Sequence, residues 1–174
     1  MNLPRLGLGI LVLLGCLHLK KAPEGNRVVT FIIKEHRPYC GGAPPHKEIE
    51  GGFRTILVNR PFFVKKEVVN QGQVPVLAKV TTDSEGRFSL KMDTGQYQLI
   101  FPEKQSSFEE FYQSQSKESR MLKAGPRDCF LSWWQKPEAV VQVTDTTTIV
   151  ECILSSTCYS GFNPCMYYTG PKPP

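Results

Sequence analysis

Residues 80–101 read VTTDSEGRFSLKMDTGQYQLIF, and this stretch decides the fold. Asp83 and Gly86 bound a four-residue segment in the way that a type I turn favours. Apolar and polar residues alternate after this turn, and again after a second turn at residues 94–95, which is the pattern of half-buried strands. The stretch therefore predicts a β-meander. The alternation places these side chains in the core: Phe88, Leu90, Tyr97 and Leu99.

The same residues carry a family resemblance. The pattern TTDxxGRFSL, followed by a short loop and GxYxL, resembles the carboxypeptidase regulatory-like domain, a transthyretin-like β-sandwich, over residues 74–101. The resemblance implies a sandwich fold and an accessory role, because this family has no shared catalytic residues. Its relatives carry the domain on peptidases, outer-membrane receptors and small exported proteins. This chain differs from them in adding a Cys-rich tail.

Further β-prone runs lie on both sides of the meander. Runs rich in β-branched and aromatic residues, bounded by Gly and Pro, predict strands at 27–34, 54–59, 62–66, 129–134, 139–143 and 147–154. Ser107 is a suitable N-cap for one short helix, with Phe108, Phe111 and Tyr112 on one face. We expect an all-β protein: a single Greek-key β-sandwich of about seven or eight strands, a short helix near 107–121 and a Cys-rich C-terminal tail.

The N-terminal residues 1–16 resemble an export signal. Arg5 precedes an apolar run of about ten residues, a usual length for a signal peptide and too short to span a bilayer. Residues 13–16, Leu-Leu-Gly-Cys, resemble a bacterial lipoprotein signal, which implies that Cys16 becomes the lipidated N-terminus. The alternative is ordinary cleavage nearby, with loss of Cys16. We expect a tether at 17–26, one sandwich domain at 27–154 and a Cys/aromatic/Pro tail at 155–174.

The charge of the chain is modest. It has 21 Lys and Arg against 16 Asp and Glu, and the basic residues are scattered. Nucleic-acid binding requires a basic stripe, so we expect no nucleic-acid partner. An export signal indicates the outer membrane or periplasm, or alternatively the extracellular space, with membrane contact only through the N-terminal lipid.

Six cysteines are present, and five remain without Cys16. In an oxidising compartment an odd number predicts two disulfides and one remaining thiol. At least one disulfide is expected within the C-terminal four, and Cys40 either bonds to that group or is the odd thiol. The competing reading is a reduced metal site. The disulfide candidates are Cys40, Cys129, Cys152, Cys158 and Cys165.

Two sets of side chains are candidate binding residues. Trp133 and Trp134 fall in a predicted strand, so one should face the core and the other should face outward. An exposed Trp beside Tyr167 and Tyr168 would suit a sugar ring or a protein partner, unless the tail or the helix covers it. A second set lies in a Pro/Gly-rich loop and would suit zinc or copper: His36, Cys40 and His46.

No catalytic motif occurs in the sequence. Cys40 beside His36 or His46 would be a thiol nucleophile, but a loop held by a disulfide explains the same residues. We expect no enzyme activity and no cofactor. The leading hypothesis is a non-catalytic exported envelope or surface protein, a structural or interaction module with a protein or glycan partner in the cell envelope. The alternative is a ligand-binding protein for a glycan, through the aromatic residues, or for a metal, through the loop.

Overall fold

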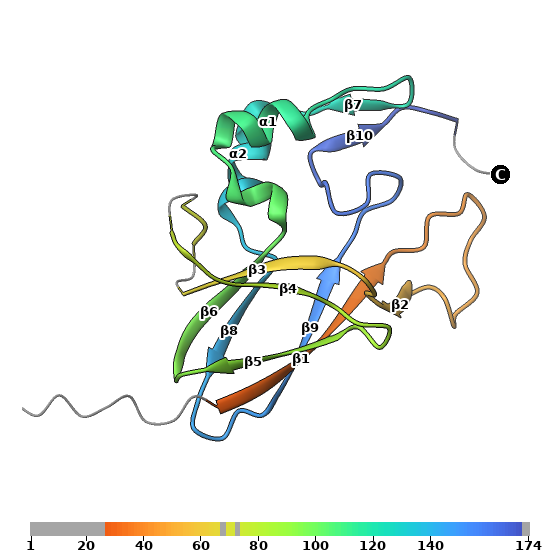
Figure 1. Cartoon of the computed structure of the whole chain (residues 1–174). Helices are drawn as coiled ribbons and strands as arrows, with labels where there is room; N and C mark the ends of the chain where they lie inside the picture. Colours follow the sequence, from red (N-terminus) through yellow and green to blue (C-terminus); the bar gives the residue numbers. More distant parts are fainter. Residues whose placement is uncertain (1–26, 67–68, 72–73, 172–174) are drawn as a thin grey trace, which may run out of the picture.

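Two four-stranded sheets form the body of the protein in a computed structural model, which describes residues 27–66, 69–71 and 74–171 (Figure 1). In the first sheet, β1 (Arg27–Arg37) is central. It pairs antiparallel with β2 (Phe53–Ile56) and then β5 (Arg87–Met92) along one edge, and parallel with β9 (Ile149–Ser155) along the other. The second sheet is antiparallel throughout, in the order β4 (Val76–Thr81), β3 (Pro61–Lys66), β6 (Gly95–Ile100) and β8 (Ala139–Val143). The predicted all-β sandwich is confirmed.

The main core lies between the two sheets. The strands predicted within residues 80–101 form, as the end of β4, β5 and β6, but the predicted β-meander is wrong. β5 pairs with β1 in the first sheet, whereas β4 and β6 both pair with β3 in the second. Phe88 of β5 lies opposite Phe31 of β1, and their rings stack with centroids 4.7 Å apart. Phe88, Tyr97 and Leu99 are buried, and Leu90 packs against them as a partly buried side chain. The period-2 pattern therefore assigned the inward face correctly.

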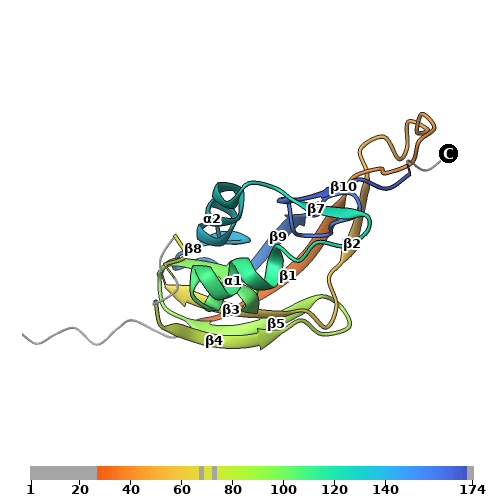
Figure 2. The same cartoon turned by 90° about the horizontal axis from the view of Figure 1, so that it is seen from above.

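A second apolar cluster lies at one end of the sandwich (Figures 1 and 2). It is built by α1 (Phe108–Gln115), α2 (Arg127–Gln135) and a small antiparallel pair, β7 (Leu122–Ala124) and β10 (Met166–Tyr168). A short 3-10 helix, η1 (Pro102–Gln105), connects β6 to α1. The buried members of this cluster are Phe111, Phe130, Cys165 and Met166.

Helix α1 begins where the sequence indicates and ends earlier than expected. A capping box joins Ser107 and Glu110 in both directions at its N-terminus. The helix ends at Gln115 rather than near residue 121. The following residues, 116–120, are polar and provide no apolar face to bury, so tertiary packing does not support a longer helix.

The strand predicted at 129–134 is wrong, because these residues belong to α2. Phe130, Trp133 and Trp134 are spaced at i, i+3 and i+4, so a helix places them on one face toward the second cluster. Pro126 and Asp128 also suit a helix start. The residues after 154 contain β10 as well, so this tail carries a strand that its irregular composition did not predict.

Two disulfides hold the C-terminal segment. Cys129 of α2 bonds to Cys165, and Cys40 bonds to Cys158. Cys152 is free and buried on β9, so this candidate forms no disulfide. The bonds join residues 36 and 118 positions apart, and by loop-closure entropy they stabilise the fold by about 4 and 5 kcal/mol.

Among the described residues, no helix is long and apolar enough to cross a membrane.

Candidate functional site

A cleft of about 560 Å³ opens between α2 and the end of β9. Its volume lies within the range of about 300–1,000 Å³ that is typical of ligand sites. The sandwich opens at this corner, because β8 and β9 belong to different sheets and α2 leads directly into β8. The cleft therefore lies at the junction of the sandwich and the second apolar cluster.

One face of α2 lines the cleft. Cys129, Ser132 and Trp133 recur at i, i+3 and i+4 and border it, and so does Lys136, the C-cap residue that follows the helix. Trp133 is half-buried, and its ring meets Phe111 edge-on with centroids 5.0 Å apart. The aromatic ring is thus held by α1 from behind, and part of it remains available to a ligand. The Cys129–Cys165 disulfide fixes the start of the same helix.

A buried ion pair also borders the cleft. The Nζ of Lys104 lies 2.5 Å from Oε1 of Glu138, and these side chains are 1% and 6% exposed. The other Glu138 oxygen accepts the N–H of Phe101 at 3.0 Å, and Lys104 donates to the carbonyl of Lys136 at 2.7 Å. Lys104 also lies 5.1 Å from the Trp133 ring centroid, in cation–π range. Both charges therefore have partners inside the molecule.

Burial acts on both members of this pair. Desolvation is the largest influence on each: it lowers the pKa of Lys104 and raises the pKa of Glu138. The mutual attraction of the two charges opposes both shifts. Each group thus relies on the other to remain charged, and losing either one leaves an uncompensated buried charge.

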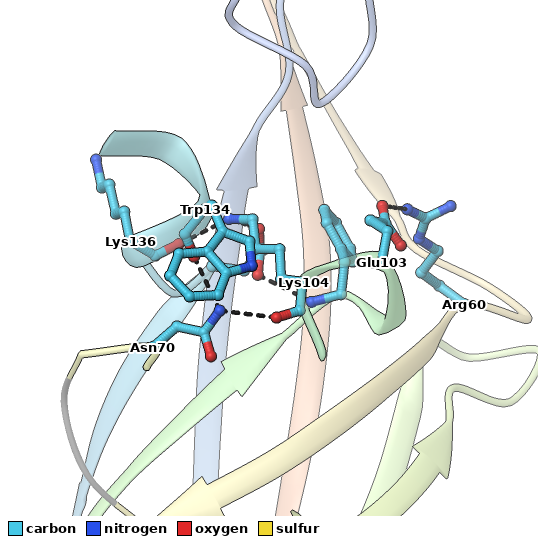
Figure 3. A network of polar contacts seen from close by, with 8 residues as sticks. Arg60, Asn70, Glu103, Lys104, Trp134 and Lys136 are labelled. Atoms are coloured by element: carbon cyan, nitrogen blue, oxygen red, sulfur yellow. Dashed lines mark hydrogen bonds and ion pairs between the residues drawn. The ribbon is translucent and has the colours of Figure 1, made fainter. Parts of the chain in front are cut away.

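Asn70 connects this pair to the end of α2 (Figure 3). Its side-chain amide donates to the backbone carbonyls of Lys104 and Trp134, both at 2.9 Å. Its backbone N–H donates to the backbone carbonyl of Gln135 at 2.9 Å. The last carbonyls of a helix have no partner within the helix. Asn70 and Lys104 supply such partners here, so they hold α2 against η1.

Lys65 belongs to the same buried network. Its side chain is fully buried, and its Nζ donates to Oδ1 of Asn70 at 3.1 Å. Consecutive Lys65 and Lys66 suggest a solvent-exposed strand end, and for Lys65 this reading is wrong. A register shift between Val64 and Lys65 lets both adjacent side chains be buried.

The cleft also contains a polar group without a partner. Ser156 is 6% exposed and borders the cleft just beyond β9. Its hydroxyl oxygen makes no hydrogen bond within the described chain. Buried polar groups are nearly always satisfied, and this oxygen is closed off from solvent, so a buried water molecule is its natural partner.

The four aromatic candidates do not form one platform. Trp133 borders the cleft, whereas Trp134 turns toward η1, where its Nε1 donates to the carbonyl of Ser106 at 3.2 Å. On β10, Tyr167 is 53% exposed, while Tyr168 stacks on Tyr159 with centroids 4.1 Å apart. No ring contact joins the Trp pair to the Tyr pair in the part of the chain that the structure describes.

The loop candidates for a metal are also separated by their contacts. Cys40 is in a disulfide, so its sulfur is not a free thiolate. His36 is hydrogen-bonded to the Gly51 carbonyl at 2.7 Å, and His46 is exposed. Within the described ranges, no group of three His, Cys, Asp or Glu side chains is placed to hold a metal ion. Cys16, the lipidation candidate, lies outside those ranges.

Sequence reasoning missed the buried residues of the cleft. The helical spacing of Phe130, Trp133 and Trp134 was a usable signal for α2. No signal identified Lys104 or Glu138, which are 34 positions apart and resemble ordinary surface charges in the sequence. Only the packing of η1 beside the start of β8 brings them together.

Comparisons with known proteins give no family. No protein-family model matches the chain, and no curated protein matches it either. A crystal structure of (S)-allantoin synthase is similar with a TM-score of 0.33 and 11% sequence identity, over 84% of this chain and 46% of that one. The chain thus spans less than half the length of that protein. Similarity at this level carries no argument about function.

Proposed function

We propose that this protein is a non-catalytic, exported interaction module that binds its partner in the cleft between α2 and β9. The observation that carries the proposal is the construction of the cleft. A half-buried Trp133 and an internally neutralised Lys104–Glu138 pair border one cavity. Binding sites commonly combine an apolar aromatic wall with a few polar groups in this way.

Export is supported by two independent features. The signal-like residues 1–16 end at Cys16, and two disulfides are compatible with an oxidising compartment. We propose attachment to the outer membrane through a lipid on Cys16, with the binding module facing the periplasm or the extracellular space. A disulfide-stabilised module on a short tether suits a structural or adaptor role in the cell envelope.

A glycan is the second candidate partner. The observation that favours it is the available part of the Trp133 ring, since sugar rings stack on aromatic faces. The metal alternative has less support, because Cys40 is oxidised and His36 is engaged with the backbone.

Site-specific photo-cross-linking in cells tests the proposal. A diazirine analogue of lysine replaces Lys136, an exposed residue that borders the cleft. The matched control carries the analogue at Lys91, which is exposed on β5 of the first sheet. We expect an envelope adduct from position 136 and none from position 91, with mass spectrometry identifying a protein or a glycan. Equal adducts from both positions, or none from position 136, would contradict binding in the cleft.

A further inference from the structure

One wall of the cleft is the free edge of a sheet. In the described chain β9 pairs only with β1, so its other edge has no neighbouring strand. Residues 153–157, at the end of this strand and just beyond it, border the cleft. A free edge presents backbone donors and acceptors that are able to accept another strand.

The hydrogen-bond pattern shows which residues present these groups. In a parallel strand, successive residues direct their N–H and C=O groups to opposite sides. The backbone carbonyl of Thr148 accepts a hydrogen bond from the backbone N–H of Thr30 of β1 at 2.9 Å. The backbone N–H of Ser156 donates to the backbone carbonyl of His36 of β1 at 3.0 Å. Residues at even positions therefore face β1. Ile153 and Ser155 direct their backbone groups away from β1, on the side of the cleft.

Helix α2 lies opposite this strand edge, and the two together bound a groove. Ser132 and Trp133 of α2 and the following residue, Lys136, border the same cavity. An extended segment between a strand edge and a helix bonds through its backbone to the edge and places alternate side chains against the wall.

Resting on the proposed function, we infer that the partner enters the cleft as an extended peptide that adds a strand to β9 at Ile153 and Ser155. Beyond these two residues the N–H of Thr157 is already bonded to the carbonyl of Gly161 at 2.7 Å, so the free part of the edge in the cleft ends at Ser155 and accepts a segment of about three residues. Lys136 is exposed at the cleft and favours an acidic side chain in the peptide, whereas Lys104 is already neutralised by Glu138.

A second copy of the chain fits this groove less well. Edge-to-edge pairing of two sandwiches brings a whole second sheet against β9, and α2 stands beside that edge. A single extended segment needs only the width between the helix and the strand. We therefore assign the edge to a peptide segment of a partner, and the test includes self-association as an outcome.

The experiment uses the full-length mature protein, purified from the envelope, and a phage-displayed library of random octapeptides. Selected peptides are synthesised, and their affinities are measured by Trp fluorescence. We expect N-methylation of alternate backbone amides of a selected peptide to weaken binding roughly tenfold, the effect of about 1.4 kcal/mol of lost hydrogen bonding. In hydrogen exchange followed by NMR, the peptide should protect the N–H of Ile153 and Ser155. The Ser156 N–H, already bonded to β1, should not change.

Two variants and their controls test the location. Ser155→Pro removes one N–H from the free edge, a position where proline is tolerated because the bond to β1 is not involved. Its control is Ile149→Pro, at the first residue of the same strand and outside the cleft. Ser132→Trp fills the groove from the exposed face of α2, and its control is Gln135→Trp, which is exposed on α2 and does not border the cleft. We expect both cleft variants to lose binding at least tenfold and both controls to keep it.

Several results would overturn the strand addition. The first is that selection on the wild-type protein enriches no peptide relative to selection on the Ser132→Trp protein. The second is that a peptide binds the cleft variants and their controls equally, or that N-methylation does not weaken its binding. The third is that the protein forms a dimer and Ser155→Pro abolishes it. A glycan adduct from position 136 together with any of these results would retain the proposed binding function and reject the peptide. Absence of a cleft-specific adduct in cells would reject the proposed function itself.

Discussion

Lys104 and Glu138 form an ion pair inside the protein, with 2.5 Å between Nζ and Oε1 and with exposures of 1% and 6%. The pair joins η1 to the residue just before β8, and the carbonyl of Lys136 and the N–H of Phe101 complete its hydrogen bonds. Removing two charges from water is costly, and their attraction offsets this cost only while both are present. The pair thus makes the position of α2 sensitive to either residue.

Lys104→Met should destabilise the protein by about 3–5 kcal/mol near pH 7, because Glu138 is left buried without its cation. Burial raises the pKa of Glu138, so the folded variant binds a proton more readily than the unfolded chain. Stability from such a group is present at low pH and is lost as the pH rises through the raised pKa. The difference from wild type in urea unfolding should therefore be smaller at pH 5 than at pH 7. Lys123→Met, in the exposed pair with Glu118, should cost no more than about 1 kcal/mol.

Glu138→Gln should show the opposite pH dependence. The amide retains an acceptor for the Phe101 N–H, but Lys104 becomes a buried charge without a counterion, at a cost of about 3–5 kcal/mol near pH 7. Burial lowers the pKa of Lys104, so the unfolded chain binds more protons than the folded variant in the window below the usual lysine pKa. The deficit measured in urea should shrink between pH 7 and pH 9.5. A deficit that grows over this range would mean that Lys104 is stabilised as a cation by other groups. Glu151→Gln, in the exposed pair with Lys34, is the matched control.

The sandwich was predictable from the sequence because its signals are local. Alternation around the turns at 83–86 and 94–95 assigned Phe88 and Tyr97 to the core without any knowledge of their partners. The strand predicted at 129–134 was wrong because its signal was local propensity alone. Trp133 and Trp134 favour strands, but burial of the helical face against the second cluster outweighed that preference.

The cleft was not predictable, because its residues meet only through long-range packing. In the sequence Lys65 resembles a surface lysine. In the structure, the register shift beside Val64 and the hydrogen bond to the side-chain oxygen of Asn70 accompany its burial. The disulfide partners of Cys129 and Cys40 were equally open, since spacing alone permits several connectivities. The free edge of β9 depends on sheet order, which no single stretch of sequence specifies.

Phe88→Ala should destabilise the protein by roughly 3–5 kcal/mol, the usual cost of truncating a buried aromatic side chain. The ring stacks on Phe31 within the main core, so its removal leaves a cavity between the sheets. Chemical denaturation measures the loss. The neighbouring Ser89→Ala, on the exposed face of β5, should change stability by less than about 1 kcal/mol. Similar small effects for both variants would place Phe88 outside the core.

Cys152 should be the only thiol between residues 27 and 171. Burial raises its pKa to about 11, so it remains protonated at pH 8 and shielded from reagents. Iodoacetamide should leave the native protein unmodified in this region and should label Cys152 alone after denaturation without reductant. Peptide mapping identifies the site. Labelling of Cys40 or Cys129 under these conditions would contradict the disulfides and revive the reduced metal site.

Cys16 should carry a lipid in the mature protein. It lies outside the described residues, and the prediction rests on the Leu-Leu-Gly-Cys sequence after a short apolar run. Mass spectrometry of protein purified from membranes should find an acylated N-terminal cysteine, and two or more chains account for stable anchoring because one chain binds only reversibly. Cys16→Ser should prevent lipidation and remove the mature protein from the membrane fraction. Cys152→Ser serves as the control for loss of a thiol and should leave anchoring unchanged. An unmodified N-terminus downstream of residue 16 would reject lipidation while retaining export, and the module would then act as a soluble periplasmic or extracellular protein.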